Sequence, residues 1–212
     1  MRWYGEPREL PLPAAVTTNS PWLDMTQSSP SWDGDSSEPF DYLPKPETMA
    51  RATIKSCSIW PAEPPRRSLY VDDALLAHPL ASVILATSWE GAPPMYMCTG
   101  WEILATEDKY LARRLHAQGV PLVFEEYEAM PHCFALVLGQ TPGAVRCFDG
   151  WAGFIRRAVS GEDIVSEAKT VRARTLEDVE LEFGGLSDVS EGEMKRRVLE
   201  KAGILETSSA KL

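Results

Sequence analysis

Hydrophobic and polar positions follow their most regular pattern in the middle of the chain. Two short segments rich in apolar and β-forming residues, at residues 95–99 and 122–127, predict strands. The apolar positions between them recur at helical spacing and predict a helix, with Thr106 as its N-cap and Gly119 at its C-terminal end. A strand, a helix and a strand with short joints form a βαβ unit, whose two strands lie parallel.

The pattern is weaker on either side of this unit. Residues 12–19 predict a short buried strand, residues 26–48 a Ser- and Pro-rich loop, and residues 68–78 a short helix. We expect three aromatic residues to order the loop by packing down: Trp32, Phe40 and Tyr42. Residues 144–159 predict an amphipathic helix that covers the sheet. Its apolar face comprises Val145, Phe148, Trp151, Ala152, Ile155 and Val159.

The composition changes after residue 160. We therefore predict a partial α/β domain at residues 1–160 and an acidic extension of loose or partial order at residues 161–212, with a helix around residues 191–201. The net charge of −10 argues against nucleic acid or an anionic membrane surface as the partner. The chain has no apolar run of about 18 residues and no secretory signal pattern, so we expect a cytoplasmic protein.

The four cysteines give no sign of a disulfide framework or a metal site. Cys57, Cys98, Cys133 and Cys147 form no Cys-x-x-Cys pair and have no metal-ligand spacing. We expect reduced thiols, and the sequence implies neither a metal nor an organic cofactor.

Two residues are placed where an α/β protein concentrates its chemistry. Glu102 follows the end of the strand at residues 95–99, and His132 lies in the loop after the next strand. Reactive groups gather at the carboxyl ends of parallel strands, which lie about 5 Å apart. Alone, each is more simply a cap or a turn residue. Together they resemble the acid and histidine of a Ser–His–acid triad. His78 and His116 have weaker contexts.

Two longer segments resemble the C-terminal half of the hormone-sensitive-lipase-like esterases, especially fungal ones. They are PAAVTTNSPWLDMTQSSPSW, with DYLP after it, within residues 13–44, and PPMYMCTGWEILATEDKYLARRLHAQGVPLVFEEYEAMPHCF at residues 93–134. The resemblance puts Glu102 at the triad-acid position and His132 at the triad-histidine position, 30 residues apart. It implies an α/β fold with about three parallel strands and flanking helices, a Pro-rich loop insertion and an acidic helical tail.

The chain departs from this family pattern in three ways. Glu102 replaces the more frequent Asp, and Cys133 replaces a usual Gly. The Gly-x-Ser-x-Gly nucleophile motif and the His-Gly-Gly oxyanion motif do not occur in the sequence. No other residue is a convincing nucleophile: Ser20 and Ser187 lack the two flanking glycines, and Cys98 is predicted to be buried in a strand.

The resemblance therefore implies a carboxylic-ester hydrolase acting on a small-molecule ester, in a truncated form that we expect to be inactive alone. A second hypothesis is a non-catalytic module that pairs with a partner, or with itself, through an exposed strand edge. A third is a scaffold whose acidic C-terminal helix binds a basic partner.

Overall fold

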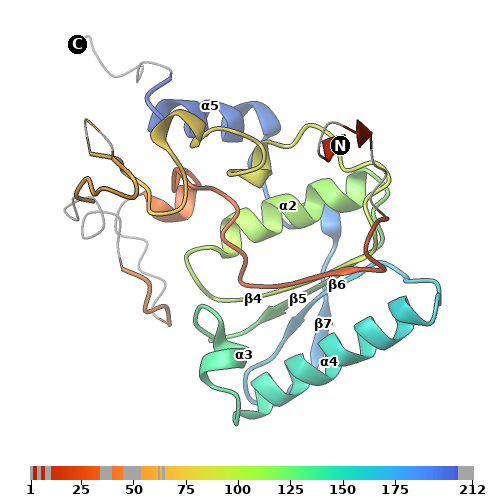
Figure 1. Cartoon of the computed structure of the whole chain (residues 1–212). Helices are drawn as coiled ribbons and strands as arrows, with labels where there is room; N and C mark the ends of the chain where they lie inside the picture. The colour runs from red at the N-terminus through yellow and green to blue at the C-terminus, as the bar shows by residue number, and fades with distance from the viewer. Residues whose placement is uncertain are drawn as a thin grey trace.

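A five-stranded sheet forms the centre of the molecule (Figure 1). The computed structural model describes residues 2–3, 6–7, 11–33, 40–44, 54–61, 63 and 65–204. The sheet has the order β3-β4-β5-β6-β7, with parallel pairing from β3 to β6 and antiparallel pairing of β7. Its strands are β3 (Val16–Asn19), β4 (Met95–Gly100), β5 (Leu122–Tyr127), β6 (Glu167–Val171) and β7 (Asp178–Glu180). Two further strands, β1 (Arg2–Trp3) and β2 (Glu6–Pro7), pair only with each other.

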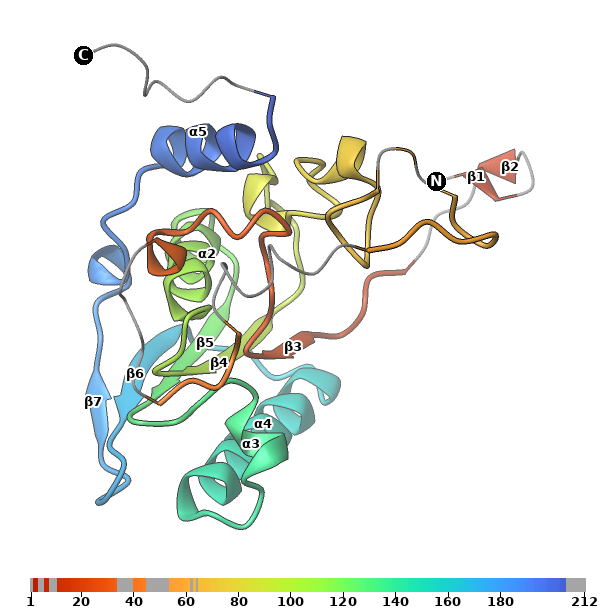
Figure 2. The same cartoon turned by 90° about the vertical axis from the view of Figure 1, so that its left-hand side faces the viewer.

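Helices cover both faces of this sheet, as Figures 1 and 2 show. Helices α2 (Ala105–Ala117) and α5 (Glu191–Lys201) lie on one side, and α3 (Phe134–Val137) and α4 (Pro142–Val159) lie on the other. Four short 3-10 helices complete the described elements: η1 (Pro30–Trp32), η2 (Asp73–Leu75), η3 (Val83–Leu85) and η4 (Phe183–Gly185). No helix in the described part of the chain combines the length and the apolar composition needed to cross a membrane.

The alternation of side chains along β4 creates the two halves of the core. Met95 and Met97 pack on the side of α2 and α5, whereas Tyr96 and Cys98 pack on the side of α4. Neighbouring residues of a strand point to opposite faces, so a strand covered on both sides is buried at every position. All six residues of β4 and all six of β5 are buried accordingly. The strands predicted at residues 95–99 and 122–127 are confirmed.

The flanking elements differ from the prediction at their ends. Helix α2 begins at Ala105, before Thr106, and its N-cap is Leu104 without a side-chain cap bond. The backbone of Leu104 is already helical, because the turn after β4 runs directly into the helix. The expected strand at residues 12–19 is ordered as β3 only from Val16.

The helix expected at residues 68–78 is wrong in extent. Only η2 forms there, with the side chain of Asp72 accepting a hydrogen bond from the backbone N–H of Ala74. His78 precedes Pro79, and the residue before a proline is disfavoured in the helical region. The segment therefore turns repeatedly instead of continuing one helix.

The predicted buried face of α4 is also wrong. The residues that pack on the sheet are Gly143, Ala144, Cys147 and Phe154. Most of the predicted face points away from the sheet, with exposed fractions between 38% and 71%: Val145, Phe148, Ile155 and Val159. The apolar arc of this helix is wide enough for two faces, and the sheet covers only one of them.

The segment after residue 160 corrects the expectation of a loosely ordered extension. Strand β6 pairs in parallel with β5 from Glu167 to Val171, and β7 pairs with β6. Lys169 of β6 also reaches the buried carboxylate of Glu125, at 3.4 Å between Nζ and Oε1. The residue-160 boundary therefore does not separate two structural units, and the sheet has five strands where about three were expected.

Helix α5 is likewise part of the core. Met194 and Val198 are fully buried in the cluster that α2 forms with the sheet. On the outer side, Arg196 forms ion pairs with Glu193 and Glu200 of the same helix. The helix pairs its own charges and packs its apolar side, which removes the support for a free acidic helix that recruits a basic partner.

Candidate active site

The turn after β4 holds the carboxylate of Glu102. This side chain is 1% exposed, and its Oε1 accepts hydrogen bonds from Thr99 Oγ1 at 3.0 Å and from the backbone N–H of Gly100 at 3.3 Å. These bonds occupy one oxygen and fix the plane of the carboxylate. The other oxygen is directed at the loop that follows β5.

That loop brings His132 to the free oxygen. Nδ1 of His132 lies 2.6 Å from Oε2 of Glu102, and the histidine side chain is 20% exposed. A carboxylate only accepts hydrogen bonds, so the proton of the neutral ring resides on Nδ1 and leaves Nε2 as an acceptor. The two candidate residues, 30 positions apart in sequence, thus form the acid–histidine contact expected of them.

The register of the sheet makes this contact possible. Gly100 pairs with Tyr127, so β4 and β5 end at the same level and their following loops meet. A Cβ atom at Gly100 would lie 2.0 Å from the carbonyl oxygen of Met130, two residues before His132. Only glycine lets the two loops approach so closely.

A distant segment supports both loops, and local sequence patterns did not reveal its role. The hydroxyl of Tyr42 donates a hydrogen bond to the backbone carbonyl of His132 at 2.8 Å, and Asp41 Oδ2 accepts one from the backbone N–H of Ile103 at 2.8 Å. Trp32 packs down as expected, at 5% exposure, but Phe40 and Tyr42 remain 42% and 54% exposed. Tyr42 therefore supports the histidine loop mainly through its hydrogen bond and less through burial of its ring.

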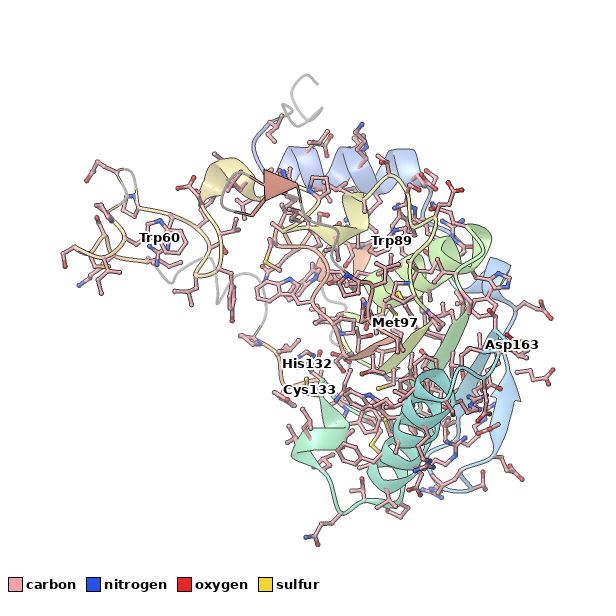
Figure 3. The ribbon with its side chains drawn as sticks, turned by 45° about the vertical axis from the view of Figure 1, so that its right-hand side comes forward. Trp60, Trp89, Met97, His132, Cys133 and Asp163 are labelled. Atoms are coloured by element: carbon pink, nitrogen blue, oxygen red, sulfur yellow. The ribbon has the colours of Figure 1, made fainter. Side chains whose placement is uncertain are left out.

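Cys133 is the unexpected member of the site (Figure 3). Its Sγ lies 3.3 Å from Nε2 of His132, while its backbone N–H donates to Ser20 Oγ at 3.0 Å. The backbone is left-handed here, with φ +51°, a conformation that suits the glycine usual at this position better than a cysteine. Partial burial, together with the nearby carboxylates of Glu102 and Asp108, raises the pKa of the Cys133 thiol.

Two further carboxyl groups lie behind the site at the start of α2. Glu107 and Asp108 are both fully buried, and burial raises the pKa of each well above its usual range. Oε1 of Glu107 accepts a hydrogen bond of 2.6 Å from the backbone N–H of Leu23. This bond ties the loop after β3 to the first turn of α2.

The remaining sequence candidates have structural contacts of their own. Ser20 Oγ accepts the bond from Cys133, and Ser187 Oγ accepts one from the backbone N–H of Val189. His116 stacks on Phe183 with ring centroids 3.9 Å apart. The Nδ1 of His78 accepts a hydrogen bond from the backbone N–H of Leu80, and Cys98 is buried with its sulfur 3.5 Å from that of Cys147.

An open apolar cavity lies between the loop that follows β3 and the segment at residues 70–81. It has a volume of about 670 Å³, and its lining includes Trp22, Met25, Tyr70 and Leu75. Trp22 also packs against the cluster of Ile103 and Leu104, which directly follow Glu102. Within the described residues, no group of three or more His, Cys, Asp or Glu side chains is arranged to hold a metal ion.

The mostly parallel sheet and the acid–histidine pair at its carboxyl edge are features of hydrolases built on an α/β scaffold. The family model of the alpha/beta hydrolase fold matches residues 4–136, and the chain belongs to this family. The comparison with curated proteins found no match.

The chain is similar in structure to solved esterases of the hormone-sensitive lipase family. An esterase from the bacterial hormone-sensitive lipase family is 27% identical, with a TM-score of 0.56 over 70% of this chain and 45% of that one. EstE7, a hormone-sensitive lipase homologue from a metagenome library, is 27% identical, with a TM-score of 0.55 over 71% of this chain and 46% of that one. This chain therefore spans less than half the length of these structures.

Proposed function

We propose that this chain provides the acid and the histidine of a carboxylic-ester hydrolase. The observation that carries the proposal is the 2.6 Å contact between His132 Nδ1 and Glu102 Oε2 at the ends of two adjacent parallel strands. In this role His132 accepts a proton from the nucleophile and returns it to the leaving alcohol, whereas Glu102 holds the ring in one tautomer and stabilises the imidazolium. The similarity to solved esterases supports the ester as substrate.

The proposed nucleophile comes from outside the five strands. In this fold the serine precedes the acid in the chain, on a strand-to-helix turn. Strand β3 is the outer strand on that side of the described sheet. A further strand pairing with β3 would bring a turn with a serine to the same carboxyl edge as Glu102 and His132. The cavity beside Trp22 provides an apolar surface for the acyl part of such a substrate.

A chimeric esterase tests this role. The half of EstE7 that this chain matches is replaced by residues 11–204, so that the EstE7 nucleophile motif faces Glu102 and His132. We expect the chimera to hydrolyse p-nitrophenyl butyrate, because the acid and histidine would face that serine. His132→Ala should lower kcat/KM by about 10³-fold, within the range for loss of a general base. Glu102→Ala should also lower it, through loss of the oriented ring.

The matched control is His116→Ala, since this histidine stacks on Phe183 and lies outside the site. Its kcat/KM should equal that of the parent chimera. A folded chimera whose activity does not change with His132→Ala would refute the proposed role. Circular dichroism and labelling of the serine by a fluorophosphonate would show that the chimera is folded and its nucleophile present.

The second candidate function is a non-catalytic module that pairs through an open surface. The exposed apolar face of α4, defined by Val145, Phe148, Ile155 and Val159, favours it. Contiguous exposed apolar side chains are typical of surfaces that another chain covers. The free edge of β3 adds backbone groups able to extend the sheet.

A further inference from the structure

The histidine of the site already has a nucleophilic atom beside it. With Nδ1 bonded to Glu102, the acceptor of His132 is Nε2, and the Sγ of Cys133 lies 3.3 Å from that nitrogen. The three side chains therefore form a continuous chain of contacts from carboxylate to imidazole to thiol. In a Ser–His–acid triad the corresponding contact at Nε2 is made by the nucleophile.

The thiol is held in a defined position. The backbone N–H of Cys133 donates a hydrogen bond to Ser20 Oγ, and the backbone at Cys133 is left-handed where its sulfur contacts the ring of the preceding residue. Figure 3 shows the two side chains next to each other at the start of α3. The residue as a whole is half-buried.

The surroundings favour a protonated thiol at rest. The carboxyl groups that face Cys133 are Glu102 and Asp108, and both act with burial to raise its pKa. The hydroxyl of Tyr42 is a third titratable group nearby, and its pKa is raised by burial and by Cys133. A thiol in this setting needs a base at the moment of attack, and Nε2 of His132 is placed to be that base.

We propose that Cys133 is an acyl-accepting thiol, activated by His132 with Glu102 as the positioning residue. The proposal goes beyond the hydrolase role above, because every group that it needs belongs to this chain. The acyl donors are activated small esters, such as aryl esters, whose leaving group requires little protonation.

The reaction balances without another reactant. The Sγ of Cys133 forms a bond to the acyl carbon while its proton moves to Nε2 of His132. The bond from the acyl carbon to the ester oxygen then breaks, and the departing oxygen takes the proton from Nε2. The products are a thioester on Cys133 and the free phenol, with His132 neutral again.

Intact-protein mass spectrometry of the unaltered chain tests the proposal. The chain is incubated briefly with p-nitrophenyl acetate, and acetylated cysteines are located by peptide mapping and by release with neutral hydroxylamine. We expect acetylation of Cys133 to slow by about 100-fold in His132→Ala, at the lower end of general-base effects. Glu102→Gln should slow it by a smaller factor. Cys133→Gly should remove the adduct at position 133 alone, without loss of folded structure.

Cys57 provides an internal control in the same samples. Its thiol is exposed, and backbone groups at Trp60 and Ile59 lower its pKa, so it reacts without help from His132. Its acetylation rate should be the same in all variants. If Cys133 is acetylated equally fast in the wild type, His132→Ala and Glu102→Gln, the proposal is wrong. Two variants are used so that the test still holds if one of them misfolds.

This experiment and the chimera fail independently. The thiol proposal is tested by acetylation of Cys133 in the unaltered chain. The ester-hydrolase proposal is tested by turnover at the serine of the chimera. Failure of thioester formation would thus leave the role of Glu102 and His132 in ester hydrolysis unaffected.

Discussion

At the scale of single residues, the site depends on the lack of a side chain at Gly100. Gly100 ends β4 where the loop before His132 crosses it, and a Cβ there would overlap the carbonyl oxygen of Met130. The backbone N–H of the same residue donates to Glu102. One glycine therefore sets both the position of the acid and the distance to the histidine.

Replacing this glycine should separate the pair. We expect Gly100→Ala to destabilise the fold by about 1–3 kcal/mol, the usual cost of overpacking, because backbone must move to admit the methyl group. The downfield NMR signal of the His132 Nδ1 proton should weaken or vanish. Gly184→Ala is the matched control, since a Cβ at Gly184 would have no atom within 4 Å. An unchanged Nδ1 signal in Gly100→Ala would contradict this account.

At the scale of elements, α2 buries two acids in its first turn next to the site. Glu107 is fully buried, and burial raises its pKa well above the usual range. In the unfolded chain the same carboxyl ionises near pH 4.3. Above that pH the unfolded state releases a proton that the folded state keeps. The contribution of Glu107 to stability therefore falls as pH rises from the unfolded pKa toward the folded pKa.

Glu107→Gln should remove this contribution. The amide oxygen can still accept the hydrogen bond from Leu23, so the loop contact is kept. We expect the stability of the variant relative to the wild type to increase as the pH is raised from 4 to 7, measured by urea unfolding. Glu90→Gln, at an exposed position, should show no such trend. A difference between Glu107→Gln and the wild type that stays constant with pH would contradict the assignment.

Helix α4 shows a second property at this scale. Its apolar residues cover two adjacent faces, of which one packs on Tyr96 and Val123 of the sheet and the other faces outward. A helix that is apolar over so wide an arc is typical of one covered on two sides. Within the described part of the chain, the side chains of this second face remain exposed.

At the scale of the whole molecule, two surfaces of the described structure are uncovered. They are the outward face of α4 and the outer edge of β3. We expect the wild-type chain to associate at micromolar concentrations, because burial of these side chains removes apolar area from water. The double variant Phe148→Glu, Ile155→Glu should remain monomeric in sedimentation velocity experiments, with little loss of stability since both side chains are partly exposed.

Val165→Glu is the control for this experiment. Val165 is 74% exposed and lies outside α4, so its replacement adds a charge without altering the proposed surface. It should associate as the wild type does. A wild-type chain that stays monomeric over the same concentrations would argue against the second candidate function.

Much of the central fold was predictable because its signals are local. The segments that become β4 and β5 are rich in apolar residues, and every position of both strands is buried because both faces are covered. The positions of Glu102 and His132 after these strands placed them at one edge, as the ends of adjacent parallel strands must lie together. Element order and spacing brought the two residues to one edge, and the resemblance to the esterase family indicated the contact between them.

The outer parts of the sheet were not predictable in the same way. Strand β6 lies toward the edge and alternates between exposed and buried positions, so its few apolar residues left the segment looking like an acidic extension. The orientation of α4 depended on which of two apolar faces met the sheet, and a helical periodicity alone does not choose between them.

The sequence by itself determined the βαβ unit and placed Glu102 and His132 at the same edge of the sheet, because periodicity and strand order act over short distances along the chain. Only the tertiary structure decided that Tyr42 supports the histidine loop, that β6 joins β5, and that the thiol of Cys133 rests against Nε2. These contacts depend on backbone conformation and on packing between segments far apart in sequence. A pattern of neighbouring residues predicts neither the backbone conformation nor the packing of distant segments.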